Sequence, residues 1–183
     1  MRIIAGTYAS RELLSRKGEE TRPTADKIKG AVFSSLQSYL HGNMLDCYSG
    51  TGNMGLEALS RGMDFCTMVD QNKEAVQVIK KNVKALQVRQ CEVIQGNIFT
   101  VIPQLQKQYQ IVYIDPPYAK QENHRLLETL DTYDLVCEEG WVIIESRKED
   151  QFEDQIASFH KQKEKKYGNT KITYYRKECM ICE

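Results

Sequence analysis

The stretch LDCYSGTGNMG, residues 45–55, begins in an apolar run and leads into a helical pattern. Its glycines at positions 50, 52 and 55 have the G-x-G-x-x-G spacing of a loop that joins a strand to a helix beside a bound ligand. Asp70 lies at the end of the next predicted strand, where an acid can hold the two hydroxyls of a ribose. Strand, glycine loop, helix and distal acid together favour a nucleotide-type ligand site over an ordinary tight turn.

Short apolar segments alternate with amphipathic ones around this loop. We predict strands at 43–48, 65–70, 91–95, 111–115 and 141–145, and helices at 54–61, 73–86, 98–106 and 125–133. Short strands that alternate with helices indicate βαβ units and a mostly parallel sheet. The two ends of the chain differ, because 27–40 predicts a leading helix and 159–177 predicts an antiparallel hairpin that turns at Gly168 and Asn169.

These patterns predict an α/β fold with a doubly wound, mostly parallel sheet and an antiparallel C-terminal hairpin. The 183 residues, 41% of them hydrophobic and 27% charged, suit one globular domain with a small appendage. We place the appendage, an N-terminal extension with its leading helix, in residues 1–40. The main domain then covers residues 41–183.

The sequence has no sign of a membrane segment or a metal site. No apolar run approaches the roughly 20 residues of a membrane span, and the first residues lack a signal-peptide core, so we expect a cytoplasmic protein. Its six cysteines are expected to be free thiols. Cys179 and Cys182 form a lone CxxC pair without a second pair or a histidine partner nearby, and the three histidines show no ligand spacing. We therefore predict no metal.

The formal net charge of zero hides an uneven distribution. Residues 1–44 hold seven basic and four acidic side chains, a balance of +3, and residues 160–177 hold seven basic and one acidic side chain, a balance of +6. Basic ends around an acidic centre are compatible with a polyanion docked at the edges and a cationic ligand in the middle. A solvated basic tail would give the same count, and charge alone does not decide between them.

The glycine loop has an acid where a dinucleotide would place its pyrophosphate. Asp46 lies near the end of the first predicted strand, just before the loop, and would repel that group. S-adenosylmethionine fits better, since it has an adenosine for Asp70, no phosphate and a sulfonium cation. Asn97, after the third strand, is placed to offer its amide to the adenine. The predicted cofactor-binding residues are Asp46, Ser49, Gly50, Gly52, Gly55, Asp70, Gln71, Asn97 and Ile98.

A rigid corner, Asp-Pro-Pro-Tyr at residues 115–118, ends the fourth predicted strand. Its two prolines fix φ and remove two backbone donors, and Asp115 is held extended because it precedes Pro116. In a doubly wound sheet this corner lies beside the glycine loop. The Asp115 carboxylate and the Pro116 carbonyl would hold the two N–H bonds of an exocyclic amino group, and Tyr118 would stack on the base. The catalytic prediction is therefore Asp115, Pro116 and Tyr118.

This set of motifs resembles the amino-group-modifying class I methyltransferases and is similar within them to the RsmD family, the bacterial 16S rRNA guanine-N2 methyltransferases. The motifs are RIIAG (2–6), TRPTADKIKGAVFSSL (21–36), LDCYSGTGNMGLEALSRG (45–62), YIDPPY (113–118) and KYGNT (166–170). The resemblance implies a seven-stranded Rossmann-like sheet, S-adenosylmethionine at Asp46, Gly50, Gly52 and Asp70, and an acceptor guanine at Asp115 and Tyr118. Asn97 departs from the acid that such enzymes often have there, which questions cofactor affinity more than identity.

The resemblance leads to a specific functional hypothesis. We expect methylation of the N2 amino group of a guanine in 16S rRNA, within the small ribosomal subunit or an assembly intermediate, by a monomer. The expected substrate-binding residues are Arg22, Pro117, Tyr118 and Tyr167. Alternatives are an amino methyltransferase for DNA adenine or cytosine or for protein glutamine, and a non-catalytic rRNA-binding assembly factor. An NAD-binding dehydrogenase is disfavoured by Asp46 and by the absence of a Tyr-x-x-x-Lys pair.

Overall fold

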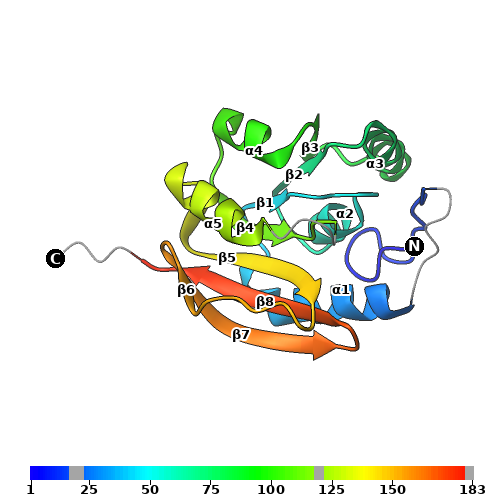
Figure 1. Cartoon of the computed structure of the whole chain (residues 1–183). Coiled ribbons are helices and arrows are strands. Elements are labelled where there is room, and N and C mark those ends of the chain that lie inside the picture. The colour runs from blue at the N-terminus through cyan, green and yellow to red at the C-terminus, as the bar shows by residue number, and fades with distance from the viewer. Residues whose placement is uncertain (17–22, 118–121, 180–183) are drawn as a thin grey trace.

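The computed structural model describes residues 1–16, 23–117 and 122–179, and for residues 23 and 24 the backbone alone. Within these residues the strands form one sheet in the order β3-β2-β1-β4-β5-β8-β7-β6 (Figure 1). The strands are β1 (Asn43–Asp46), β2 (Phe65–Asp70), β3 (Cys91–Gln95), β4 (Tyr109–Ile114), β5 (Val136–Arg147), β6 (Gln155–Ile156), β7 (Phe159–Tyr167) and β8 (Thr170–Lys177). Strands β1 to β5 pair in parallel, and β8, β7 and β6 continue the sheet antiparallel.

This topology confirms the predicted doubly wound α/β fold with an antiparallel C-terminal hairpin. It includes one strand more than the seven expected, because the two residues of β6 pair with the start of β7. The bounds of β2 and β3 match the prediction. Strand β5 begins five residues earlier than expected and passes through Glu139, which has a left-handed φ of 58°.

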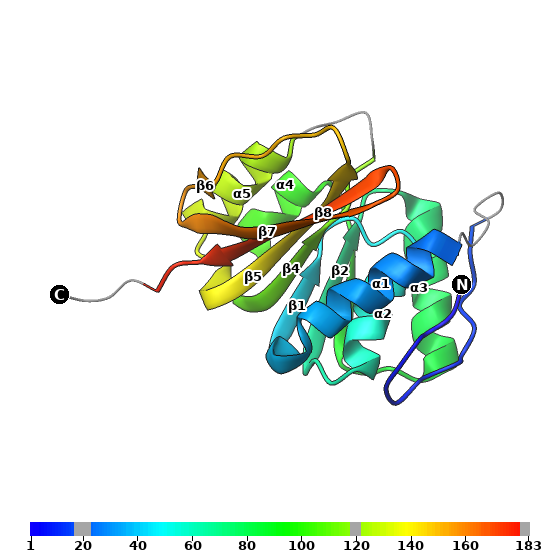
Figure 2. The same cartoon turned by 90° about the horizontal axis from the view of Figure 1, so that it is seen from below.

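Helices cover both faces of the sheet (Figures 1 and 2). They are α1 (Pro23–Ser35), α2 (Asn53–Ser60), α3 (Lys73–Leu86), α4 (Ile98–Val101) and α5 (Asn123–Thr132), with 3₁₀ turns η1 (Gln37–Tyr39) and η2 (Ile102–Gln104). Helices α1, α2 and α3 share one core with Met44 and Ile111, whereas α4 and α5 share another with Leu45 and Val112. Neighbouring strand residues thus point to opposite cores, as the two-residue period of a strand requires.

Two predicted helices are shorter than expected. The segment 98–106 forms α4 and then η2, because Pro103 has no N–H to continue the helical hydrogen bonds. The leading helix ends at Ser35 instead of residue 40 and is followed by η1. Helix α3 has the predicted bounds, since Asn72 caps it by accepting hydrogen bonds from the backbone N–H groups of Glu74 and Ala75.

The N-terminal segment is docked on α2 by a buried acid. Glu57 accepts hydrogen bonds from the backbone N–H groups of Ile4 and Ala5 at 2.8 and 3.1 Å, and it pairs with Lys29 of α1 at 3.3 Å. Gly6 follows with a φ of 86°, and a Cβ there would lie 1.8 Å from the Ser60 carbonyl oxygen. These contacts explain the RIIAG motif as a docking segment. The proposed domain boundary at residue 40 stays a prediction.

Two findings on the described residues concern membrane spans and cysteines. None of the helices in these ranges is long and apolar enough to cross a membrane. The five cysteines that the structure describes are free thiols, and Cys182 lies outside the described residues.

Candidate active site

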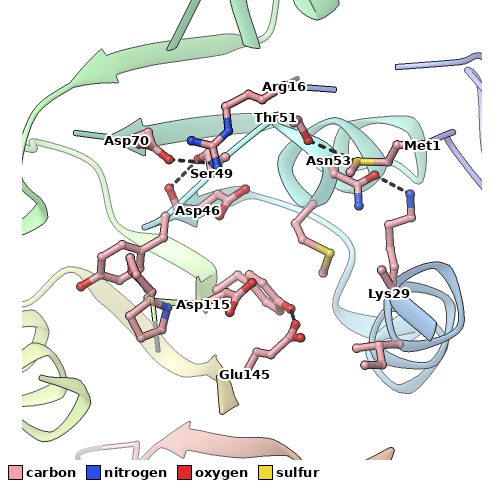
Figure 3. Close-up of a pocket in the computed structure, with 18 of the residues that line it drawn as sticks. Met1, Arg16, Lys29, Asp46, Ser49, Thr51, Asn53, Asp70, Asp115 and Glu145 are labelled. Carbon is pink, nitrogen blue, oxygen red and sulfur yellow. Dashed lines mark hydrogen bonds between the residues drawn. The ribbon is translucent and has the colours of Figure 1, made fainter. Parts of the chain in front are cut away.

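Four adjacent parallel strands each bring a carboxyl group to the same edge of the sheet. In the order of the strands these are Asp70 on β2, Asp46 on β1, Asp115 directly after β4 and Glu145 on β5. They line one cavity of about 410 Å³, and Figure 3 shows them in this order across it. Ligands of doubly wound sheets bind at this edge, where the order of strands reverses.

The glycine loop closes one side of the cavity. Gly50 and Gly52 have left-handed φ values of 56° and 79°, which glycine adopts without strain. A Cβ on Gly55 would lie 2.8 Å from the side chain of Met68, so the third glycine lets α2 pack closely on β2. Gly50 and Ser49 line the cavity, whereas Gly52 and Gly55 shape the loop behind it.

Asp70 is fixed by the backbone on both of its oxygens. Oδ2 accepts a hydrogen bond from the Gly50 N–H at 2.8 Å, and Oδ1 accepts one from the Asn72 N–H at 2.8 Å. Asp70 therefore connects the glycine loop to the start of α3. Gln71, the next residue, also lines the cavity. Asp70, which we predict to bind the ribose, is therefore held rigidly at the rim of the cavity.

Asp46 is 1% exposed and accepts a hydrogen bond from the Gly55 N–H at 3.2 Å. Burial raises its pKa to about 7, against the opposing effect of that hydrogen bond, and the charge of Asp70 contributes in the same direction as burial. The Asp46 carboxyl therefore changes charge near neutral pH. A cation bound next to it would favour the ionised form.

The structure does not bring the other two predicted cofactor residues to this cavity. Asn97 is exposed and caps α4, where its Oδ1 accepts a hydrogen bond from the Phe99 N–H at 3.0 Å. Ile98 is buried in the core beneath α4 and α5. Neither residue lines the cavity, and their assignment to the adenine stays a prediction.

The corner after β4 forms the other side of the cavity, which Asp115, Pro116 and Pro117 line. Asp115 as a whole is exposed, but its carboxyl lies between the cavity walls. Desolvation there raises its pKa well above the ordinary value, and the charges of Glu145 and Asp46 add to this effect. The prediction for Tyr118 falls outside the described residues, as does that for Arg22.

Tyr167, predicted to bind substrate, ends β7 and is half-buried against the core of α1 and α2. It does not line the cavity. Its position at the hairpin turn fits a packing role, and contact with substrate stays a prediction.

Our sequence reasoning missed Glu145 and Tyr113. The Tyr113 hydroxyl donates a hydrogen bond to Oε2 of Glu145, and both residues line the cavity. Burial raises the pKa of Glu145, and the hydrogen bond from Tyr113 opposes this shift. A signal was available, because Glu145 ends the predicted strand 141–145 as Asp70 ends the predicted strand 65–70.

Lys29 is a second residue that sequence reasoning missed. Its side chain is 1% exposed, and Nζ donates a hydrogen bond to the Arg2 carbonyl at 2.6 Å. Nζ also donates one to Oδ1 of Asn53 at 2.6 Å (Figure 3). Burial lowers its pKa, while the nearby Glu57 carboxylate opposes that shift. Lys29 therefore connects the N-terminal segment, α1 and α2 at the wall of the cavity.

Comparison with known proteins identifies the family. The family model described as "Conserved hypothetical protein 95" matches residues 1–176. YlbH of Bacillus subtilis, provisionally named as an rRNA methyltransferase, is 31% identical over 182 residues, covering 97% of this chain and 99% of the relative. The "Ribosomal RNA small subunit methyltransferase D" of Escherichia coli is 27% identical over 179 residues, covering 97% and 90%.

A solved structure agrees with these relatives. The protein yhhF of Escherichia coli, provisionally titled as a methyltransferase, superimposes with a TM-score of 0.88 at 27% identity and covers 97% of this chain and 98% of its own. The family model, which matches residues 1–176, extends over the glycine loop and the corner after β4 and into β8 of the C-terminal hairpin. The chain therefore belongs to this family and is a methyltransferase of the RsmD type that its sequence motifs resemble.

Proposed function

We propose that this protein transfers a methyl group from S-adenosylmethionine to the exocyclic N2 amino group of a guanine in 16S rRNA. The substrate would be the small ribosomal subunit or an intermediate of its assembly. The observation that carries the proposal is the order of acids along the sheet edge, Asp70 and Asp46 at one end and Asp115 and Glu145 at the other. One end suits the cofactor and the other suits an amino group.

The residues at the first end fit S-adenosylmethionine. This cofactor supplies an electrophilic methyl group on a sulfonium cation. The buried Asp46 carboxylate favours a cation and disfavours a pyrophosphate, and the fixed Asp70 is suited to accept hydrogen bonds from ribose hydroxyls. The left-handed glycines let the backbone approach the ligand without side chains between them.

The residues at the second end fit an exocyclic amino group. The nitrogen lone pair of such a group is delocalised into the base, so the amine is a weak nucleophile. The Asp115 carboxylate and the Pro116 carbonyl would each accept one N–H, which orients the nitrogen and frees its lone pair. Asp115 can then take up the proton that the methylated amine releases, because its raised pKa makes it a better base than an ordinary aspartate.

Charge at the same end of the sheet supports an RNA substrate. Lys148 lies just beyond β5 and donates a backbone hydrogen bond to the Asn169 carbonyl at 3.0 Å, so the β7–β8 turn adjoins the carboxyl end of β5. Lys148, Lys165 and Lys166 are exposed there. Such side chains can contact phosphates without reading sequence. The names of the YlbH and methyltransferase D relatives, which refer to rRNA, agree with this substrate.

The test uses radiolabelled S-adenosylmethionine. The protein is incubated with small ribosomal subunits, free 16S rRNA and DNA from a strain that lacks the gene, and the labelled nucleoside is then identified by digestion. We expect N2-methylguanosine from subunits or rRNA, and the better of these two substrates shows whether assembly precedes methylation. Label in DNA or in protein would contradict the proposal. Cofactor binding without any label would favour a binding factor instead.

A further inference from the structure

We infer that Glu145 is the residue that selects guanine, by accepting a hydrogen bond from the ring N1–H next to the amino group that Asp115 holds. This inference rests on the proposed function and concerns the acceptor half of the same site. Glu145 would contact the substrate base directly and would therefore be a specificity-determining residue.

The register of the sheet places Glu145 beside Asp115. Strand β4 pairs in parallel with β5, with Tyr113 opposite Ile143 and Ile114 opposite Ile144. The next residues along the chain are Asp115, directly after β4, and Glu145 in β5. Side chains at equal register on neighbouring strands point to the same face, and the strands lie about 4.8 Å apart. Two carboxyl groups therefore face the cavity side by side, on the side of Asp115 away from Asp70 (Figure 3).

Tyr113 holds one half of the Glu145 carboxyl. Tyr113 is 2% exposed, and burial raises the pKa of its hydroxyl well above the ordinary value, so the hydroxyl stays a donor to Oε2 of Glu145. Among the residues that the structure describes, no donor is bonded to the other oxygen, Oε1. A carboxylate oxygen that faces a cavity without a donor is suited to receive one from a ligand.

The donor pattern of guanine matches two carboxyl groups. Guanine presents N2–H and N1–H side by side on one edge, whereas the ring nitrogen next to the amino group of adenine or cytosine carries a lone pair. That lone pair would face the Glu145 oxygen and repel it. Burial raises the pKa of Glu145, and the hydrogen bond from Tyr113 opposes this rise and so favours the ionised, purely accepting form that makes this discrimination. Asp115 alone would accept any exocyclic amine.

The decisive probe is 2-aminopurine, which keeps the amino group at C2 but has an unprotonated N1. Target RNA, assembled into subunits where assembly is required, is prepared with guanine or with 2-aminopurine at the methylated position. We expect wild type to prefer guanine by about tenfold to hundredfold in kcat/KM, the range of one charge-assisted hydrogen bond. Glu145→Gln should reduce the preference to below about threefold. The glutamine amide can accept from the N1–H of guanine through its oxygen or donate to the bare N1 of 2-aminopurine through its NH₂ group.

Two further variants separate specificity from stability. Glu145→Asp keeps a carboxylate and should keep a preference for guanine at reduced turnover. Glu138→Gln removes an exposed acid from the other end of β5 and should behave as wild type. Thermal unfolding and calorimetry with S-adenosylmethionine should show that Glu145→Gln remains folded and still binds cofactor.

The outcomes distinguish this inference from the proposed function. If wild type methylates guanine N2 and Glu145→Gln keeps the full preference for guanine, the inference is wrong and the proposed function stands. If wild type labels a base other than guanine, both are wrong. A loss of preference in Glu145→Gln with cofactor binding intact supports Glu145 as the guanine-selecting residue.

Discussion

The cavity has two halves, a proposed cofactor half with Asp70 and Asp46 and a proposed acceptor half with Asp115 and Glu145. The two halves hold their acids in different ways. In the cofactor half, Asp70 and Asp46 accept hydrogen bonds from the protein backbone, at Gly50 and Asn72 for the first and at Gly55 for the second. In the acceptor half, Asp115 has no hydrogen-bond partner and Glu145 has one, within the described residues.

This difference fits what each half is proposed to recognise. An acid that already receives backbone donors is oriented before the ligand arrives, which suits a cofactor that is the same in every turnover. An acid without donors keeps its acceptor capacity for the N–H groups of a substrate. The cost is the desolvation of both carboxyl groups, which raises the pKa values of Asp115 and Glu145, and at Asp115 the charges of Glu145 and Asp46 add to this effect. The following predictions test this contrast, from the largest expected effect to the smallest.

Replacing Asp115 by alanine should separate the two halves most clearly. Turnover should fall by roughly a hundredfold to ten-thousandfold, because the amino group loses its acceptor and its base. The affinity for S-adenosylmethionine should stay close to that of wild type, since the cofactor half is intact. Single-turnover methylation and calorimetry measure the two quantities. Unchanged turnover would remove the corner from the mechanism.

Replacing Asp70 by alanine should have the opposite pattern. The affinity for S-adenosylmethionine should weaken by about 1.5–3 kcal/mol for each charge-assisted hydrogen bond lost, and the glycine loop also loses the hydrogen bond from the Gly50 N–H to Asp70. Glu74→Ala, which removes an exposed acid from the first turn of α3, serves as the matched control. Equal affinity of the two variants in calorimetry would show that Asp70 is misassigned.

The pH dependence of cofactor binding should come from Asp46. Burial raises its pKa to about 7, so the carboxyl is mostly protonated at pH 6 and mostly ionised at pH 8. Only the ionised form attracts a sulfonium cation, so affinity should rise about tenfold from pH 6 to pH 8. Calorimetry at pH 6, 7 and 8 measures this change.

Two controls accompany the pH series. Asp46→Asn should show weaker binding with a flat profile over the same range. S-adenosylhomocysteine lacks the sulfonium charge and should show a smaller rise with wild type. A wild-type affinity that is constant from pH 6 to pH 8 would contradict the assignment of Asp46 to the cation.

Much of this contrast could be predicted from local sequence signals. The glycine spacing, the acids at the ends of β1 and β2 and the cap at Asn72 are short-range features, and the predicted bounds of β2, β3 and α3 are the observed ones. The cofactor half therefore follows from one βαβ unit. Asn97, which we predicted to contact the adenine, caps α4 and does not line the cavity.

The acceptor half depends on which strands become neighbours. Glu145 lies 30 residues after Asp115, and only the pairing of β4 with β5 brings them together. A lysine is ordinarily expected at the surface, but Lys29 is buried where α1 contacts α2 and pairs there with Glu57. The two-residue strand β6 has no local pattern at all and exists through its pairing with β7. Tertiary contacts decide these three features, so they cannot be predicted from the residue pattern of one segment.

The smallest effect should come from Tyr113→Phe, which removes the hydroxyl and keeps the ring in the core. The hydroxyl only orients Glu145, so only part of the roughly 1.5–3 kcal/mol of a hydrogen bond to a charged group is lost to the reaction, and kcat/KM for guanine should fall by a few fold to about tenfold. The preference for guanine over 2-aminopurine should decrease but persist, because the carboxylate remains. A Tyr113→Phe effect as large as that of Asp115→Ala would mean that the hydroxyl acts on the substrate itself. In that case the acceptor half would contain a donor as well as two acceptors, and its contrast with the cofactor half would no longer be one of free against bonded acids.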